Sequence, residues 1–127
     1  MNFEDFLDIE YLRKTETALE AVMTVRDDML QPFGYLHGGV TIALLETVAS
    51  RGAFLNCGDR ELPFGVDVHV AHRSSVRDGQ VRAVVNLARE EPTSKGLRKQ
   101  TWSVAALSDS GETVSEGEII ILLVPVS

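Results

Sequence analysis

Cysteine is almost absent from this 127-residue chain, since Cys57 is its single example. One cysteine cannot form an intrachain disulfide or a cysteine-based metal cage. Long apolar runs are missing as well: residues 119–126 form one of the longest, far below the roughly 20 residues that a membrane-spanning helix needs. Residues 1–8 are acidic and lack the basic-then-apolar order of a signal peptide. These absences favour a cytoplasmic protein that does not bind membranes.

Basic residues are also in short supply, with 12 Lys and Arg against 19 Asp and Glu, which gives a net charge of −7. That balance argues against general nucleic-acid binding. The charge is unevenly placed, however, because residues 73–99 carry a net charge of +4 and the rest of the chain carries −11. A basic segment on an acidic protein suits a small anionic ligand, although Arg and Lys on strand edges also discourage aggregation. Charge alone leaves both interpretations open.

The size and composition of the chain are those of one globular domain. A chain of 127 residues can bury one hydrophobic core but not two, and 44% hydrophobic with 24% charged residues are ordinary values. No repeat or low-complexity segment is present, and no linker rich in Pro, Gly or Ser divides the sequence. We therefore expect a single domain over residues 1–127.

An apolar segment over residues 40–54 predicts a helix that is buried on nearly all sides, with bounds near residues 39 and 56. Glu46 is out of place in this helix, because an ionised carboxylate is seldom buried without a partner. Ser50 follows one helical turn later and projects from the same face. Arg51 lies one position further round, and we expect it to pair with an acidic residue across a subunit interface.

Two glycines, Gly38 and Gly39, follow His37 at the start of this helix. The first N–H groups of a helix have no partner inside it, and glycine lets other atoms approach them closely. Such a helix start near a carboxylate is suited to attack on a carbonyl carbon and to binding of the oxyanion that forms. Three structural roles remain open alternatives: a Glu46 compensated by its neighbours, a His37 that only caps the helix, and a Ser50 bonded to its own helix.

Strand patterns surround the helix. Alternating apolar residues occupy residues 15–25, 64–71, 81–87, 99–107 and 114–124, and residues 77–80 have the composition of a hairpin turn. About five strands with short connections predict a mostly antiparallel sheet. Because the helix is apolar nearly all round, the sheet must enclose it. The sequence therefore predicts an α+β fold in which a curved antiparallel sheet wraps one long central helix.

Some consequences of this architecture concern the core and the assembly. Trp102 and Phe64 are expected in the core, with the lining of an acyl pocket as the alternative if their strand faces allow it. One small sheet does not easily cover both its helix and its own edges, so we expect at least a dimer.

With these residues laid out, the chain resembles the hotdog-fold acyl-CoA thioesterases. It is most similar to the branch with phenylacetate-pathway (PaaI-like), 4-hydroxybenzoyl-CoA and dihydroxynaphthoyl-CoA thioesterases. The resemblance rests on His37-Gly38-Gly39 followed by an acidic residue, Glu46, seven positions after the second glycine. The Gln-Pro-Phe-Gly-Tyr-Leu segment at residues 31–36 adds to it. Because the similarity covers nearly the whole length, it implies a single hotdog thioesterase domain.

The resemblance implies catalytic roles for five residues. Glu46 would be the nucleophile or the general base, and Ser50 would assist it or the hydrolytic water. Gln31 and His37 would bind and orient the thioester. The N–H group of Gly38 would polarise the thioester oxygen.

The resemblance also implies a surface that binds coenzyme A. Its residues would be Gly39, Gly65, His72, Arg73, Ser74, Ser75, Lys95, Arg98 and Lys99. Residues 92–99 look like a loop several residues longer than in related proteins, which leaves the contacts there open. No metal or cofactor is implied, since coenzyme A is part of the substrate. His69 and His72 are three apart on a strand and would point to opposite faces, which is poor geometry for a shared ion.

The implied function is hydrolysis of an acyl-CoA, with an aromatic acyl group favoured, to the free acid and coenzyme A. One alternative is a broad-specificity thioesterase for medium-chain acyl-CoAs. Another is a hotdog-type dehydratase, whose motif we do not find, and a third is an acyl-CoA-binding module without turnover. The expected partners are a small-molecule acyl-CoA and further copies of the chain, in a homotetramer built as a dimer of dimers, with no nucleic acid and no membrane.

Overall fold

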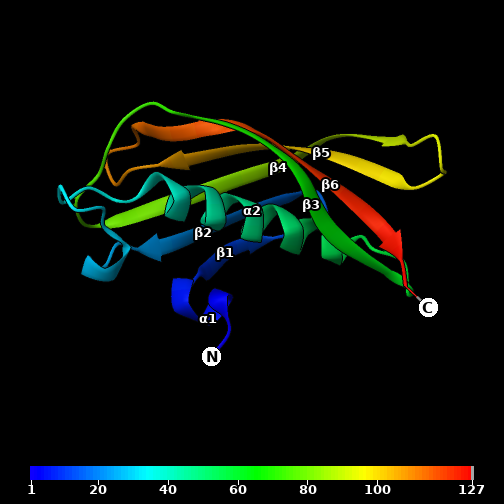
Figure 1. The fold of residues 1–127 in the computed structure, drawn as a ribbon, viewed down its shortest axis with the longest axis horizontal. Coiled ribbons are helices and arrows are strands. Elements are labelled where there is room, and N and C mark those ends of the chain that lie inside the picture. Colours follow the sequence, from blue (N-terminus) through cyan, green and yellow to red (C-terminus); the bar gives the residue numbers. More distant parts are fainter. Residues whose placement is uncertain (127) are drawn as a thin grey trace.

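A single curved sheet encloses a long helix in the computed structural model, which describes residues 1–126 (Figure 1). The elements in chain order are α1 (Phe3–Leu7), β1 (Glu10–Lys14), β2 (Ala18–Thr24), the 3-10 turn η1 (Asp27–Met29), α2 (Gly38–Leu55), β3 (Glu61–His72), β4 (Gln80–Pro92), β5 (Arg98–Leu107) and β6 (Thr113–Pro125). The predicted α+β architecture is confirmed. Within residues 1–126, none of the helices combines the length and the apolar character needed to cross a bilayer.

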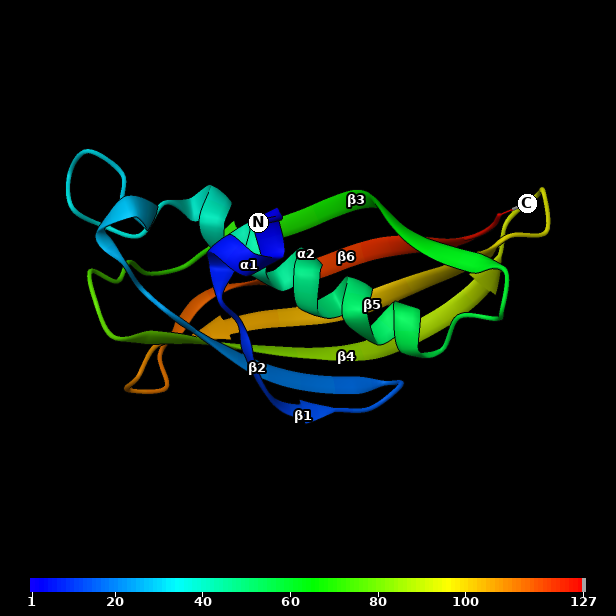
Figure 2. The same ribbon diagram turned by 90° about the horizontal axis from the view of Figure 1, so that it is seen from below.

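The sheet has six antiparallel strands in the order β1-β2-β4-β5-β6-β3, so β1 and β3 form its two edges (Figure 2). The predicted hairpin at residues 77–80 is wrong, because β3 pairs with β6 and not with β4. The local turn chemistry is nevertheless present: Gly79 has a φ of 79° and its carbonyl accepts a hydrogen bond of 2.9 Å from Val25 N–H. The turn therefore lies at the end of the connection from β3 to β4, two strands that are not neighbours in the sheet.

Two strand bounds differ from those that the sequence indicates. β1 is absent from the predicted strands, because its side chains are exposed apart from half-buried Tyr11 and it has no alternating pattern to detect. The predicted loop over residues 92–99 is wrong in its extent, since Pro92 pairs with Arg98 and Glu91 pairs with Lys99. Only residues 93–97 connect β4 to β5. Strand ends with polar side chains on both faces lack the apolar alternation of a strand, so their sequence resembles that of a loop.

The core lies between the concave side of the sheet and α2. Leu44, Leu45, Val48 and Ala49 of α2 are fully buried, as is Trp102 of β5, whose predicted place in the core is confirmed. Gly52 lets the helix approach this ring, because a Cβ at position 52 would lie 2.5 Å from Trp102 Cη2. The core thus fixes the rotation of α2 and the direction in which its polar side chains point.

The predicted core position of Phe64 is wrong, since this residue is 50% exposed. A β-bulge between Gly65 and Asp67 reverses the alternation along β3. Phe64 therefore pairs with Leu122, whereas Val68 pairs with Ile119 on the buried face of β6. The bulge places Gly65 toward α2 and Phe64 on the outer face.

Candidate active site

The start of α2 presents backbone donors to solvent. His37 is the N-cap, and its Nδ1 accepts a hydrogen bond of 2.9 Å from Gly39 N–H. Within residues 1–126 we find no acceptor for Gly38 N–H. A free N–H group at the positive end of a helix is a donor for a developing oxyanion. His37 therefore caps the helix, as one of its alternative roles requires, and it leaves the Gly38 donor available.

His72 of β3 covers the start of α2. Its Nδ1 lies 2.7 Å from Oγ of Ser115, a fully buried residue of β6. This contact holds the imidazole over Gly38, where an added Cβ would lie only 2.6 Å from His72 Nε2. Glycine at position 38 thus leaves room for the imidazole as well as for a ligand.

A cavity of about 210 Å3 opens beside these groups, and we call it the helix-start pocket. Its lining consists of Gln31, Tyr35, Leu36, Gly38, Thr41, His72, Ser74, Ser75, Val76 and Val114. Gln31 Oε1 accepts hydrogen bonds from the N–H groups of Phe33 (2.7 Å) and Tyr35 (3.2 Å). Since these two donors occupy the amide oxygen, the amide NH2 of Gln31 is the group that remains to donate to a ligand.

A second cavity of about 330 Å3 lies further along α2, and we call it the acid pocket. Its lining consists of Phe3, Glu4, Ala43, Glu46, Thr47 and Ser50. The Glu46 carboxylate rests against Gly65 of β3, where an added Cβ would lie 2.5 Å from Oε2. The ion pairs found within residues 1–126 do not include Glu46. The carboxylate is therefore held in place by packing and has no counter-ion.

The two pockets have no lining residue in common. Gly38 and Glu46 are eight positions apart on one helix, which corresponds to about 12 Å along its axis. The structure therefore places the predicted oxyanion donor in one pocket and the predicted acid in the other. Gln31, His72, Ser74 and Ser75 accompany Gly38, whereas Ser50 accompanies Glu46.

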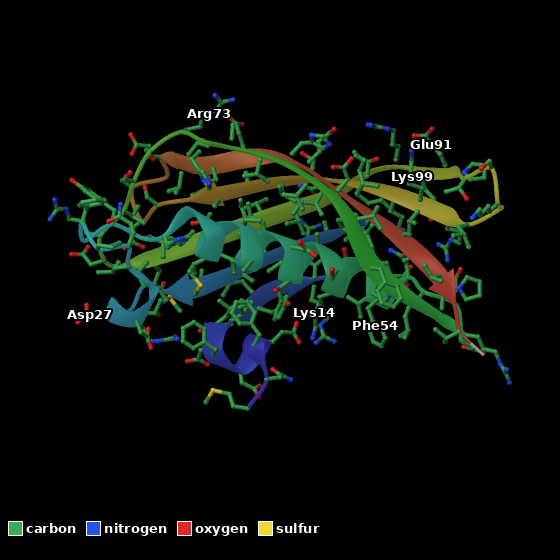
Figure 3. The ribbon with its side chains drawn as sticks, viewed as in Figure 1. Lys14, Asp27, Phe54, Arg73, Glu91 and Lys99 are labelled. Atoms are coloured by element: carbon green, nitrogen blue, oxygen red, sulfur yellow. The ribbon has the colours of Figure 1, made fainter. Side chains whose placement is uncertain are left out.

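The basic residues expected to bind coenzyme A are not brought together with these pockets. Arg73 pairs with Glu116 at 3.1 Å, and Lys99 pairs with Glu91 across the β4–β5 ladder. Figure 3 shows Arg73 and Lys99 on the outer side of the sheet and toward opposite ends of it. Lys95 lies in the exposed turn between β4 and β5. Gly39 lines neither pocket.

Arg98 belongs to a polar network at the C-terminal end of α2. Its guanidinium donates to Glu61 Oε1 (2.8 Å), to Glu90 Oε1 (3.0 Å) and to the Asn56 carbonyl (3.3 Å). Hydrogen bonds from Arg98 and Gln100 lower the pKa of Glu90, and the same contact with Glu90 raises the pKa of Arg98. These bonds tie the last turn of α2 to β3, β4 and β5, so Arg98 has a structural role in this chain.

Several residues around the pockets were not predicted from the sequence. Tyr35 lines the helix-start pocket, and its hydroxyl accepts a 2.8 Å hydrogen bond from Arg77, whose guanidinium stacks 4.3 Å above the ring. Thr47 lies next to Glu46 and one turn before Ser50, so helical spacing could have identified it. Phe3 and Glu4 come from α1, and no local pattern links them to α2.

Metal-binding geometry is not found in the part of the chain that the structure describes, where no three His, Cys, Asp or Glu side chains cluster. His69 Nε2 lies 3.0 Å from Asp67 Oδ1. His69 pairs with Glu118 and His72 with Ser115 along the β3–β6 ladder, an odd number of positions apart. The two imidazoles are therefore on opposite faces of the sheet, as the sequence predicts.

Comparisons with known proteins agree on one family. The family model described as Thioesterase superfamily matches residues 33–114. The proofreading thioesterase EntH of Cronobacter turicensis is 36% identical over 84% of this chain and 74% of its own length. The 1,4-dihydroxy-2-naphthoyl-CoA hydrolase of Escherichia coli is 33% identical over 87% of this chain and 77% of its own length. A crystal structure of a mutant thioesterase from Pseudomonas aeruginosa is 25% identical, with a TM-score of 0.88 over 98% of this chain and 87% of that one.

Proposed function

This chain belongs to the thioesterase superfamily, and from that membership we propose that it hydrolyses an aromatic acyl-CoA to the free acid and coenzyme A. The resemblance to hotdog-fold thioesterases is confirmed, and the chain is a thioester hydrolase. Its place in the PaaI-like branch stays a prediction. The observation that supports the proposal most strongly is the Glu46 carboxylate in the acid pocket, on the helix that begins at Gly38. Among residues 1–126, the carboxylate has no counter-ion and Gly38 N–H has no acceptor.

The chemistry needs one carboxylate and one oxyanion donor. A Glu46 oxygen attacks the thioester carbon, the carbon–sulfur bond breaks to release the coenzyme A thiolate, and water then hydrolyses the mixed anhydride. In the alternative route, Glu46 takes a proton from a water molecule that attacks the same carbon. Both routes give the same products, and a thiolate is a good enough leaving group that we propose no metal or cofactor. Single turnover in 18O-labelled water labels the Glu46 carboxylate only if the anhydride forms.

We propose that a second copy of the chain completes the site. β3 is an edge strand of 12 residues, and its apolar side chains at Leu62, Phe64, Val66 and Val68 are 37% to 53% exposed. Such an edge is a template for another strand, and a second β3 fits it in a two-fold arrangement. Two copies of α2 would then run antiparallel, so that the helix-start pocket of each chain faces the acid pocket of its partner. Two such dimers would form the proposed tetramer.

The acyl group we propose is aromatic. The acid pocket has room for a ring system at about 330 Å3, and Phe3 provides an aromatic surface on one side. One relative is by name a hydrolase of 1,4-dihydroxy-2-naphthoyl-CoA, which is an aromatic thioester. A cytoplasmic location agrees with the single cysteine, because chains in oxidising compartments commonly use disulfides.

The proposal is tested by thiol release from benzoyl-, 4-hydroxybenzoyl-, dihydroxynaphthoyl-, hexanoyl- and palmitoyl-CoA. We expect the aromatic thioesters to be hydrolysed fastest, and Glu46→Ala to lower kcat by about a thousandfold or more. Glu112→Ala, which removes an exposed carboxylate in the β5–β6 turn, is the matched control and should leave kcat unchanged. Absence of turnover with every thioester, or full activity of Glu46→Ala, would contradict the proposed function.

A further inference from the structure

The short helix α1 provides two of the six residues that line the acid pocket. We infer that α1 selects the acyl group, with Phe3 setting the size of the group and Glu4 setting its charge. This inference rests on the proposed function, because it places the acyl group in the pocket that contains Glu46. It concerns substrate choice and leaves the attacking group unchanged.

Several contacts hold α1 in place. Asn2 and Asp5 form a capping box, with two hydrogen bonds of 3.0 Å between side chains and backbone. Leu7 is fully buried in the core. The Arg26 guanidinium stacks 4.9 Å above the Phe6 ring and donates to the Phe6 carbonyl. Because α1 is fixed at both ends, it forms a wall of the pocket, and its residues can discriminate between ligands.

Phe3 is the one large apolar side chain among the six that line the pocket. Apart from Glu46, the side chains on the α2 side are short: Ala43, Thr47 and Ser50. The Phe3 ring stacks on Phe6 with 5.9 Å between the ring centroids and is 56% exposed, so it is open to contact with a ligand in the pocket. A flat acyl group therefore gains contact area from Phe3, whereas a two-carbon acyl group is too short to reach α1.

Glu4 adds a second carboxylate to a pocket that already contains Glu46. Glu4 lies close to Arg51, whose Nη2 is 3.9 Å from Glu4 Oε2. The acidic partner expected for Arg51 is thus found in the same chain. Both side chains are more than a third exposed, so this long contact leaves much of the Glu4 charge to act on a ligand. Acyl groups that end in a carboxylate should be disfavoured against uncharged groups of equal length.

The charge selection is tested with succinyl-CoA and butyryl-CoA, which have acyl groups of equal length. The wild type should prefer butyryl-CoA, and Glu4→Gln should raise the succinyl-to-butyryl ratio of kcat/KM roughly three- to fivefold. Glu10→Gln on β1 removes an exposed carboxylate that lines neither pocket and should leave the ratio unchanged. An unchanged ratio in Glu4→Gln would overturn the role of Glu4.

The size selection is tested with benzoyl-CoA and acetyl-CoA. Phe3→Ala should lower the benzoyl-to-acetyl ratio of kcat/KM by about tenfold, while the exposed apolar control Leu12→Ala should not change it. Each ratio is measured on one preparation, so partial unfolding of a variant cancels. If the enzyme is active but the variants leave both ratios unchanged, the selection of the acyl group by α1 is refuted and the proposed function is not. A wild type that hydrolyses none of these four thioesters and none of the panel above would instead refute the proposed function.

Discussion

The helix-start pocket and the acid pocket lie on the same helix, but they are built in different ways. Polar groups around the first are already bonded to the protein: Gln31 to the Tyr35 N–H, His37 to Gly39, and His72 to Ser115. In the second, Glu46 rests on Gly65 and has no counter-ion within the described residues 1–126. Groups that are held by hydrogen bonds suit binding and orientation, whereas an uncompensated carboxylate suits chemistry. On the proposed function, the first pocket would position the thioester and supply the oxyanion donor, and the second would supply the attacking carboxylate.

Among the variants that separate the two pockets, Gly65→Ala should lower activity most. It alters the acid pocket alone. The new Cβ would meet Glu46 Oε2 at 2.5 Å and force the carboxylate away. We expect kcat to fall about a hundredfold while KM changes little, because a misplaced attacking group is costly even when binding is intact. Steady-state kinetics check this, with thermal unfolding to show that the variant is folded. A folded Gly65→Ala enzyme with normal kcat would mean that catalysis does not depend on the position of Glu46 against Gly65.

A smaller effect should come from Gly38→Ala, which alters the helix-start pocket alone. The added methyl group would meet His72 Nε2 at 2.6 Å and intrude into the space for the thioester. The N–H donor is retained, so we expect KM to rise about tenfold with a lesser change in kcat. A variant in which kcat falls a hundredfold at constant KM would remove the division of roles between the pockets.

Gly52→Ala should affect neither pocket but should disturb the packing of α2 against the sheet. Its Cβ would lie 2.5 Å from Trp102 and 2.6 Å from Leu19 Cδ1, both in the core. We expect the free energy of unfolding to fall by about 1–3 kcal/mol, as for other overpacked cores. Urea unfolding measures this change. A stability equal to that of the wild type would show that α2 can move away from β5 without cost.

The smallest effect should come from Glu90→Gln, at the far end of α2. Arg98 lowers the pKa of Glu90 in the folded protein, so the pair stabilises the fold above the ordinary carboxyl pKa, and this stabilisation is lost as the pH falls through the folded value. Because the pair is about a third exposed, we expect a loss of only about 0.5 kcal/mol at pH 7 and a smaller loss at pH 3. Urea unfolding at both pH values checks the sign, and a larger loss at the lower pH would contradict it.

Much of the fold was predictable because its signals are local. The apolar run of α2 and the alternation in β2, β4, β5 and β6 follow from periods of 3.6 and 2 residues. The exceptions have physical causes that local patterns do not contain. The bulge at Gly65 reverses the side on which Phe64 lies, and β1 is too exposed to alternate. The pairing of β3 with β6 depends on contacts across half the chain.

The candidate site also contains residues that local sequence predicts and residues that only tertiary packing brings together. Gln31 and Gly38 of the helix-start pocket and the N-cap His37 fall within eight residues, so one block of sequence predicts all three. Phe3 and Glu4 reach the acid pocket only because α1 packs beside α2. The expected contact of Arg98 with coenzyme A stays a prediction, and in the folded chain its guanidinium donates to two carboxylates from other strands. Tertiary packing decides which partner a charged side chain meets, and sequence composition does not contain that information.

The measurement that most directly tests the two-chain site is complementation between inactive variants. Glu46→Ala breaks the acid pocket, and Gln31→Ala breaks the helix-start pocket. In a mixed dimer, the Glu46→Ala chain still supplies an intact helix-start pocket, and the Gln31→Ala chain still supplies the carboxylate that faces it. Random mixing should therefore restore about a quarter of the wild-type activity, since half the dimers are mixed and each has one intact site.

Two differently tagged variants, refolded together and separated by their tags, provide the mixed dimers and prove that they exist. We expect activity in the doubly tagged fraction and almost none in either parent. An inactive doubly tagged fraction would contradict the account, because it would show that Gln31 and Glu46 must belong to the same chain.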